Sequence, residues 1–235
     1  GMKVLHIVGG NFHDGASKGA YLLHKGLLAK DVHSRLLVQR NGSEKLFASA
    51  VAETPFKQAM TMLRRGCDTL PSRMYIGKRI GLFSTGMCGL DLRRTAYYRD
   101  CDIVHLHWIN KGMVKIKDLR GIGKPLIWTM RDMWPMTGGC HYAFDCCRYR
   151  EKCGKCPHLG SRHELDLSRF VWWRKKRLLP ADMHLVAVSS WLAECASQSS
   201  LLSNHDLTVI PNCVDTDEFS PLNRLQARQI LGLPQ

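Results

Sequence analysis

The sequence lacks any long apolar run. No stretch approaches the ~20 consecutive apolar residues that a membrane-spanning helix needs, and the apolar segment after Met2 is too short for a signal peptide. Internal repeats and low-complexity segments are also missing, which leaves an ordinary globular chain. We therefore expect a soluble, cytoplasmic protein, in which clustered cysteines favour metal binding over disulfides.

Acidic residues are scarce. The chain has 20 Asp and Glu against 34 Lys and Arg, a formal charge of +14 over 235 residues. Such a charge implies acidic partners, namely nucleic acid, an anionic membrane surface or a phosphorylated substrate. Composition alone does not choose among them. The length allows one large domain, or one domain plus an appendage.

Apolar runs alternate between strand-like and helix-like patterns, which is typical of a parallel α/β sheet with helices on both faces. We expect strands at residues 3–8, 33–39, 102–108, 124–130, 183–188 and 207–210. Helices are expected near residues 17–30, 55–65, 91–100, 113–120, 165–179 and 222–231. Asn41 and Gly42 indicate a turn.

The expected helix at residues 55–65 has an apolar face. Phe56, Ala59, Met60 and Leu63 follow helical spacing, and Met60 is the typical gap-filling core residue. We predict that Gly66 and the following Pro71 end this helix.

Glycines follow the first strand, where Gly9 and Gly10 let backbone amides approach a ligand closely. The pattern is not GxGxxG, so the dinucleotide fingerprint is missing. An anion-binding turn and a plain tight turn both remain open. Ser189 and Ser190 likewise open a helix, either as a simple cap or as donors to an anion.

Two histidines lie near the carboxyl end of the strand at residues 102–108. His105 and His107 are two residues apart, so they face the same side of the sheet. Open α/β sheets bind ligands at this edge. We take His107 as the stronger candidate for lining a site, and we expect no metal on this pair.

Five of the ten cysteines lie between Cys140 and Cys156. The spacing Cys140-x5-Cys146-x6-Cys153-x2-Cys156 predicts a closed four-thiolate zinc site, which is structural and not catalytic. Cys147 is surplus, and His141 or His158 could replace one cysteine. Unligated thiols, or disulfides formed on purification, are the alternatives.

The helix at residues 165–179 joins aromatic residues to a basic run. Trp172 and Trp173 are followed by Arg174, Lys175, Lys176 and Arg177. This pattern suits an interfacial helix at an anionic bilayer. A helix with one buried aromatic face and a solvated basic end fits it equally well.

Five segments resemble family 4 (group 1) GT-B glycosyltransferases, in the branch that assembles exopolysaccharide, capsule or lipopolysaccharide. They are MKVLHIVGG with GASKGAYLLHKGL, DIVHLHWIN, WTMRDMWPMTGGCHYAFDCCRYREKCGKCPHLG, VAVSSWLAECASQSSLL and VIPNCVDTDEFSP. They occur in the family's order and cover nearly the whole chain. Cys213 replaces the glycine of the family's PNGVD signature.

The resemblance implies a Rossmann-like, N-terminal acceptor-side domain over residues 2–214, with a Cys-rich insertion at 138–160. Residues 215–235 would be the linker to a C-terminal nucleotide-sugar domain. By motif position, Gly9 and Gly10 match the loop near the donor diphosphate. Arg131, Asp132 and His107 match the cleft, with His141 held at its edge.

The implied activity is a retaining transfer of sugar from a nucleotide-sugar to a lipid-linked or oligosaccharide acceptor, with no protein nucleophile and no catalytic metal. We expect peripheral attachment to the inner face of the plasma membrane, no nucleic-acid partner, and no activity for this chain alone. The alternatives are a zinc-containing nucleic-acid-binding protein and a non-catalytic scaffold.

Overall fold

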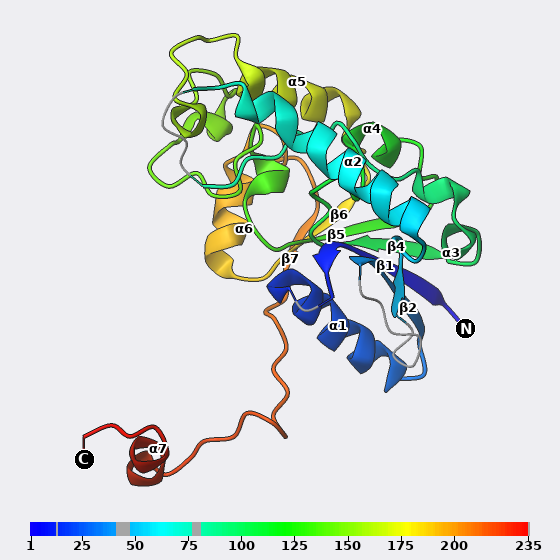
Figure 1. Cartoon of the computed structure of the whole chain (residues 1–235), viewed down its shortest axis with the longest axis vertical. Helices are drawn as coiled ribbons and strands as arrows, with labels where there is room; N and C mark the ends of the chain where they lie inside the picture. The colour runs from blue at the N-terminus through cyan, green and yellow to red at the C-terminus, as the bar shows by residue number, and fades with distance from the viewer. Residues whose placement is uncertain (13, 41–47, 77–80, 235) are drawn as a thin grey trace.

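A computed structural model describes residues 1–12, 14–40, 48–76 and 81–234. Its centre is a seven-stranded sheet in the order β3-β2-β1-β4-β5-β6-β7, with every pairing parallel (Figure 1). The strands are β1 (Lys3–Asn11), β2 (His33–Arg40), β3 (Ala48–Ala50), β4 (Ile103–Leu106), β5 (Leu126–Met130), β6 (His184–Ala187) and β7 (Leu207–Val209). The predicted parallel α/β sheet is confirmed, with β3 as an unforeseen edge strand. The expected turn at Asn41 and Gly42 lies outside the described residues.

Helices cover both faces of this sheet. Figure 1 shows α1 on one side and α2, α4 and α5 on the other. The α-helices are α1 (Gly15–Leu28), α2 (Pro55–Arg73), α3 (Ala96–Arg99), α4 (Ile116–Leu119), α5 (Leu167–Leu178), α6 (Ser190–Ser197) and α7 (Arg224–Ile230). Covered on both faces, the central strands are mostly apolar, and Ile7, Val104 and Leu106 are fully buried.

Helix α2 is eight residues longer than its apolar pattern predicts, since it continues through Gly66 and Pro71 to Arg73. A tertiary contact explains the extension. Asp68 is fully buried, and its Oδ1 accepts hydrogen bonds from Thr85 Oγ1 at 2.8 Å and from Met87 N at 3.1 Å. These bonds fix the second half of the helix, so the local breakers are overridden.

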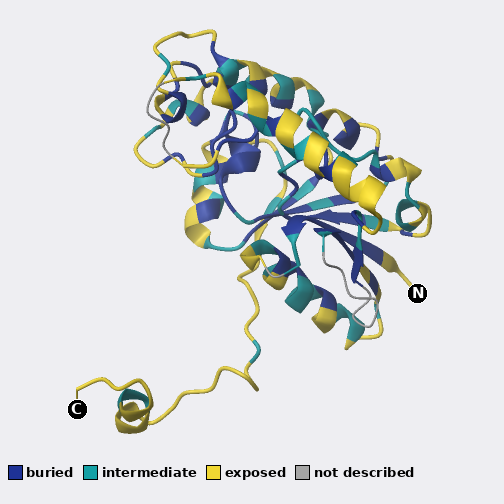
Figure 2. Cartoon of the chain, in the orientation of Figure 1, coloured by how far each residue is buried: buried dark blue, intermediate teal, exposed yellow. Residues whose placement is uncertain are grey.

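The orientation of α2 contradicts the prediction that its apolar face packs into the core. Phe56 is 75% exposed and Leu63 59%, while Thr61, Asp68 and Ser72 are buried. Figure 2 shows the helix mostly in the exposed colour. Of the polar inner positions, Asp68 bonds to the segment beneath the helix, while Thr61 and Ser72 bond within α2. Most of the large apolar side chains of α2 are presented to solvent.

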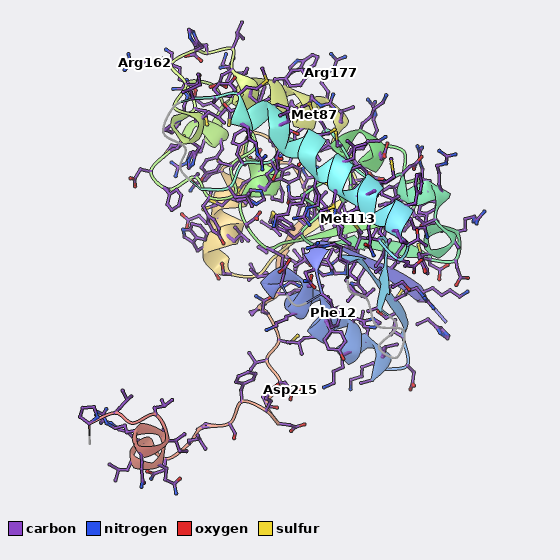
Figure 3. All side chains as sticks on the ribbon, in the orientation of Figure 1. Phe12, Met87, Met113, Arg162, Arg177 and Asp215 are labelled. Atoms are coloured by element: carbon purple, nitrogen blue, oxygen red, sulfur yellow. The ribbon has the colours of Figure 1, made fainter. Side chains whose placement is uncertain are left out.

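The basic run on α5 is not a uniformly solvated end either. Lys175 is fully buried, with Nζ donating to Trp134 O and to Thr137 O and lying 3.5 Å from the Trp134 ring centroid. Arg177, by contrast, lies on the outer side of α5 (Figure 3). Burial lowers the pKa of Lys175 to about 7. Lys175 therefore belongs to the core and not to a membrane-facing patch.

Residues 211–234 form an almost wholly exposed tail that leaves the sheet beyond β7 (Figures 1 and 2). It touches the domain where Lys25 Nζ pairs with Asp215 Oδ2 at 3.2 Å. Among the described residues, no helix is long and apolar enough to cross a bilayer.

Candidate functional site

A groove lies where the strand order reverses, between β1 and β4. In open α/β sheets this switch point, at the carboxyl ends of the strands, is the usual ligand site. The groove measures about 370 Å³ and is lined by Gly9, Asp14, Gly15, Ala16, Trp108, Lys111, Arg131, Asp132, Tyr142 and Asn212. A larger hollow of about 680 Å³ lies at the opposite, amino-terminal ends of β1 and β2. Topology and chemistry both favour the smaller groove.

The glycine turn forms the floor of the groove. Gly9 N donates to Trp108 O at 2.5 Å, and a Cβ on Gly9 would meet Asn110 O at 2.7 Å. Gly10 has φ +87°, and a Cβ there would meet Asp14 Oδ2 at 2.5 Å. Only glycine fits this close approach of β1 to β4. The N-terminus of α1 also faces the groove, with the carboxylate of Asp14 beside it.

Arg131 reaches the groove from the end of β5 and lies against α1. A Cβ on Gly19 of α1 would come within 2.9 Å of Arg131 Cζ, so this glycine makes room for the guanidinium. Its nitrogens donate to Asn212 Oδ1 and, at 3.2 Å, to His107 Nδ1. Burial lowers the pKa of Arg131 to about 10. The guanidinium is still charged at neutral pH, so it can bind an anion in the groove.

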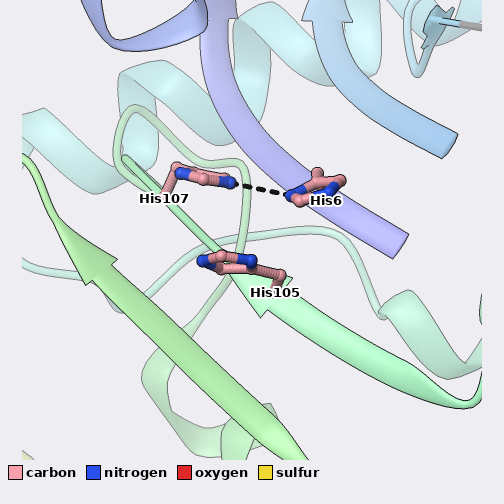
Figure 4. A group of neighbouring side chains, drawn as sticks. All are labelled: His6, His105 and His107. Atoms are coloured by element: carbon pink, nitrogen blue, oxygen red, sulfur yellow. Dashed lines mark hydrogen bonds between the residues drawn. The ribbon is translucent and has the colours of Figure 1, made fainter. Parts of the chain in front are cut away.

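His107 lies behind Arg131 and not on the groove wall, being 1% exposed. Arginine can only donate, so His107 Nδ1 accepts and its Nε2–H donates to His6 Nδ1 at 3.0 Å. Figure 4 shows this contact beside the stacked His105 ring. Burial lowers the pKa of His6 and of His107 well below 6.5. Neutral histidines thus orient Arg131 from within the sheet.

Among the described residues, His6, His105 and His107 form the group of three metal-binding side chains whose ligand atoms lie within 4.8 Å of one another. Their other contacts argue against a cation there. His105 Nε2 is 2.7 Å from Thr129 Oγ1, and the charged guanidinium of Arg131 contacts His107. A cation bound at this place would be repelled by the positive charge of Arg131 in the low-dielectric interior of the protein.

Asp132 is the best-connected acidic residue of the groove. Its Oδ2 accepts from Trp108 Nε1 at 2.8 Å and from His141 Nδ1 at 2.5 Å. Its Oδ1 accepts from Trp134 N at 2.9 Å. The carboxylate therefore fixes the Trp108 indole, which forms part of the groove wall.

The chain of bonds continues inward from His141. Its Nε2 lies 2.9 Å from Ser84 Oγ, so Asp132, His141 and Ser84 are connected like a hydrolase triad. Ser84 is 1% exposed, however, and its hydroxyl is closed to substrate. We interpret this series of hydrogen bonds as a support that holds Asp132 and Trp108 in place. Ser84, at its inner end, does not act as a nucleophile.

The sequence candidates are only partly brought together. Gly9, Arg131 and Asp132 line the groove, and Gly10 lies directly beneath it. His107 and His141 are buried supports. Ser189 caps α6 by accepting from Leu192 N at 3.2 Å, and Ser190 is exposed at the same helix start. Neither serine is among the groove-lining residues.

Sequence reasoning missed several lining residues, among them Trp108, Lys111, Tyr142 and Asn212. Two of these had a usable signal. Trp108 directly follows His107 in the DIVHLHWIN segment, and Asn212 belongs to the PNCVD segment. Lys111 and Tyr142 stand in irregular connections, and only the fold carries them to the groove.

Comparison with known proteins agrees with this architecture. The sequence model of Glycosyltransferase Family 4 matches residues 13–218. The match spans most of the chain, and the chain belongs to this family.

Individual relatives are distant. The chain is 31% identical over 71 residues to an Escherichia coli (strain K12) protein described as a colanic acid biosynthesis glycosyl transferase, WcaC; this covers 28% of the chain and 18% of that protein. A glycosyltransferase structure from Rickettsia africae ESF-5 aligns with TM-score 0.51 and 12% identity, over 100% of this chain and 50% of that one. HepE of Anabaena, solved with UDP, aligns with TM-score 0.42 and 14% identity, over 98% and 50%.

The chain thus spans half the length of the solved structures and less of the curated relative. The Rickettsia alignment shows a Rossmann-like half of a GT-B fold. The protein is therefore a glycosyltransferase-family domain with a groove at its topological switch point.

Proposed function

We propose that residues 2–214 are the acceptor-side half of a retaining glycosyltransferase, which transfers a sugar from a nucleotide-sugar to a lipid-linked saccharide. The observation that carries this proposal is the groove between β1 and β4, with Arg131 charged and fixed in its wall. The tail after residue 214 would lead to a donor-binding domain. Asn212 lies in the groove where the chain leaves the sheet, so such a domain would be joined beside the site.

Within this proposal the groove orients an acceptor hydroxyl toward the anomeric carbon of the donor. A new bond forms between that oxygen and the anomeric carbon, the bond to the donor's diphosphate breaks, and the diphosphate takes the hydroxyl proton. Arg131 is not a base, because it stays protonated, and it serves by binding a phosphate or carboxylate. Asp132 contributes by fixing Trp108.

Attachment to an anionic membrane is the second part of the proposal. The outward face of α2 carries exposed Phe56 and Leu63, and that of α5 carries Trp173 with Arg177 stacked 4.6 Å from its ring centroid. The two helices lie on the same side of the sheet (Figure 1). Apolar and aromatic groups beside cations are the side chains that enter a lipid headgroup layer. A lipid-linked acceptor would be presented at such a surface.

The transferase is tested on the full gene product, with UDP-sugars as donors and a membrane lipid extract as the acceptor source. Mass spectrometry detects the added hexose, and NMR reads the anomeric configuration. Arg131→Ala should lower transfer about 10- to 100-fold, the range expected when a charge-assisted contact is removed. Arg99→Ala on α3, which changes an exposed arginine outside both the groove and the membrane surface, serves as the control. An inverted product, or equal rates for the two variants, would contradict the proposal.

The membrane claim is tested by cosedimentation with vesicles of equimolar phosphatidylcholine and phosphatidylglycerol. The double variant Phe56→Ser with Trp173→Ser should lose binding, whereas Ile230→Ser on α7, also an exposed apolar residue, should bind like the parent. Lys175 is unsuitable as a probe because it is buried. Equal binding of both variants would remove the membrane claim and leave the groove untouched.

A further inference from the structure

Four cysteines line one small cavity in the connection between β5 and α5. The cavity measures about 10 Å³, and its lining includes Cys140, Cys146, Cys153 and Cys156. We propose that these four side chains form a structural zinc site. A volume of about one small probe sphere suits a single ion or water, and four thiolates close a tetrahedral coordination shell with no open position.

The structure selects the ligands among the candidates that the sequence left open. Cys147 is exposed and its thiol contacts Asp145 O. Both ring nitrogens of His141 are engaged, with Asp132 and with Ser84. His158 lines the cavity, but its Nε2 is 3.2 Å from Ala143 O. Cys146 is left as the fourth ligand beside the three buried cysteines.

Two glycines are required by this arrangement. A Cβ on Gly138 would lie 2.7 Å from Cys153 Cβ, and Gly154, in the Cys153–Cys156 knuckle, has φ +131° with Glu164 O against it. The local backbone is therefore shaped around the sulfurs.

Charge balance also favours metal. Four thiolates and one Zn²⁺ leave a net charge of about −2 in a buried place, which needs compensating cations. Arg148 lines the same cavity, and Arg169 Nε donates to Cys153 O. Two guanidinium groups therefore lie where the negative charge would need them.

Disulfides are the competing arrangement. All four cysteines are free thiols in the structure.

The sulfurs lie further apart than zinc requires. Among the described residues no three cysteine sulfurs lie within 4.8 Å of one another, whereas Zn–S bonds of about 2.3 Å put tetrahedral sulfurs about 3.8 Å apart. Zinc binding would therefore draw the four sulfurs together. Cys140 directly precedes His141, and the site would thereby hold the Asp132–His141 support of the groove.

The proposal is tested by measuring the zinc content of the chain purified without added metal. Mass spectrometry counts the bound zinc, and a colorimetric indicator follows the zinc released when a mercurial blocks the thiols. We expect one zinc per chain, released as the mercurial titrates four thiols. Cys147→Ser, the adjacent control, should retain the metal, and Cys146→Ser should lose it or hold it at least tenfold more weakly. A parent chain with no zinc above buffer, or equal zinc in the two variants, overturns the proposal.

A second measurement covers variants that fail to fold. The parent refolded with Co²⁺ should show the sulfur-to-cobalt charge-transfer bands of a tetrahedral four-thiolate site, unchanged in Cys147→Ser. Cobalt that binds with an octahedral spectrum, or not at all, would refute thiolate ligation. The sugar-transfer assay is independent of this outcome, so failure of either proposal is recognised separately.

Discussion

Replacing Asp132 by asparagine tests the polar support behind the groove. Asp132 accepts three hydrogen bonds, two of them from the buried donors His141 Nδ1 and Trp134 N. The asparagine amide has only one acceptor oxygen, so its NH2 group would face one of the N–H donors that the carboxylate accepts from. With about 1–3 kcal/mol for each buried donor left without a partner, we expect Asp132→Asn to lower the free energy of unfolding by roughly 1–3 kcal/mol.

Asp14→Asn is the matched control. Asp14 lines the same groove but is exposed, and it accepts one bond, from Asn11 N at 2.8 Å. Both variants remove one negative charge, so groove electrostatics change alike, while only Asp132→Asn disturbs buried bonds. Urea unfolding at pH 7, followed by tryptophan fluorescence, measures both. If the two variants fall within about 0.5 kcal/mol of each other, the assignment of Asp132 as a buried support is refuted.

Two further predictions concern the histidines and α1. Burial lowers the pKa of His105 to about 4 in the folded chain, whereas in the unfolded chain it is near 6.5. Below pH 6.5 the unfolded chain therefore binds more protons, and the free energy of unfolding falls as the solution is acidified. The loss reaches roughly 3 kcal/mol at pH 4. His105→Gln should reduce this loss in urea titrations from pH 7 to 4.5; an unchanged slope would contradict it. Gly26→Ala, whose Cβ meets nothing within 4 Å, should stabilise α1 by about 0.5–1 kcal/mol. Gly19→Ala should instead displace Arg131 and weaken transfer; equal transfer by the two alanine variants would refute the packing of Arg131 against Gly19.

Much of the fold was predictable because its signals are local. Doubly buried strands such as β1 and β4 are mainly apolar runs, and each predicted strand centre matches an observed strand. The short strand β3, with sequence ASA, has no such signal and exists only through its pairing with β2. The length of α2 was missed because Asp68 binds a segment 17 residues away.

Part of the candidate site was equally accessible. The glycine turn and the Arg131-Asp132 pair stand at strand ends, and strand ends of a parallel sheet share one edge. How deeply a side chain is buried behind that edge depends on residues far away in the sequence, so it cannot be predicted from its neighbours in the chain. His107 and His141 therefore appeared as groove residues, although both are buried supports.

The sequence by itself determined the order of the strands and helices except β3, the glycines at the end of β1 and the cluster of cysteines, because each depends on residues close together in the chain. Tertiary structure alone decided which face of α2 meets solvent, that Lys175 is buried while Lys176 is exposed, and that four cysteines face one cavity. The physical reason is that burial depends on what packs against a residue. Those partners, such as Trp134 over Lys175, lie many residues away.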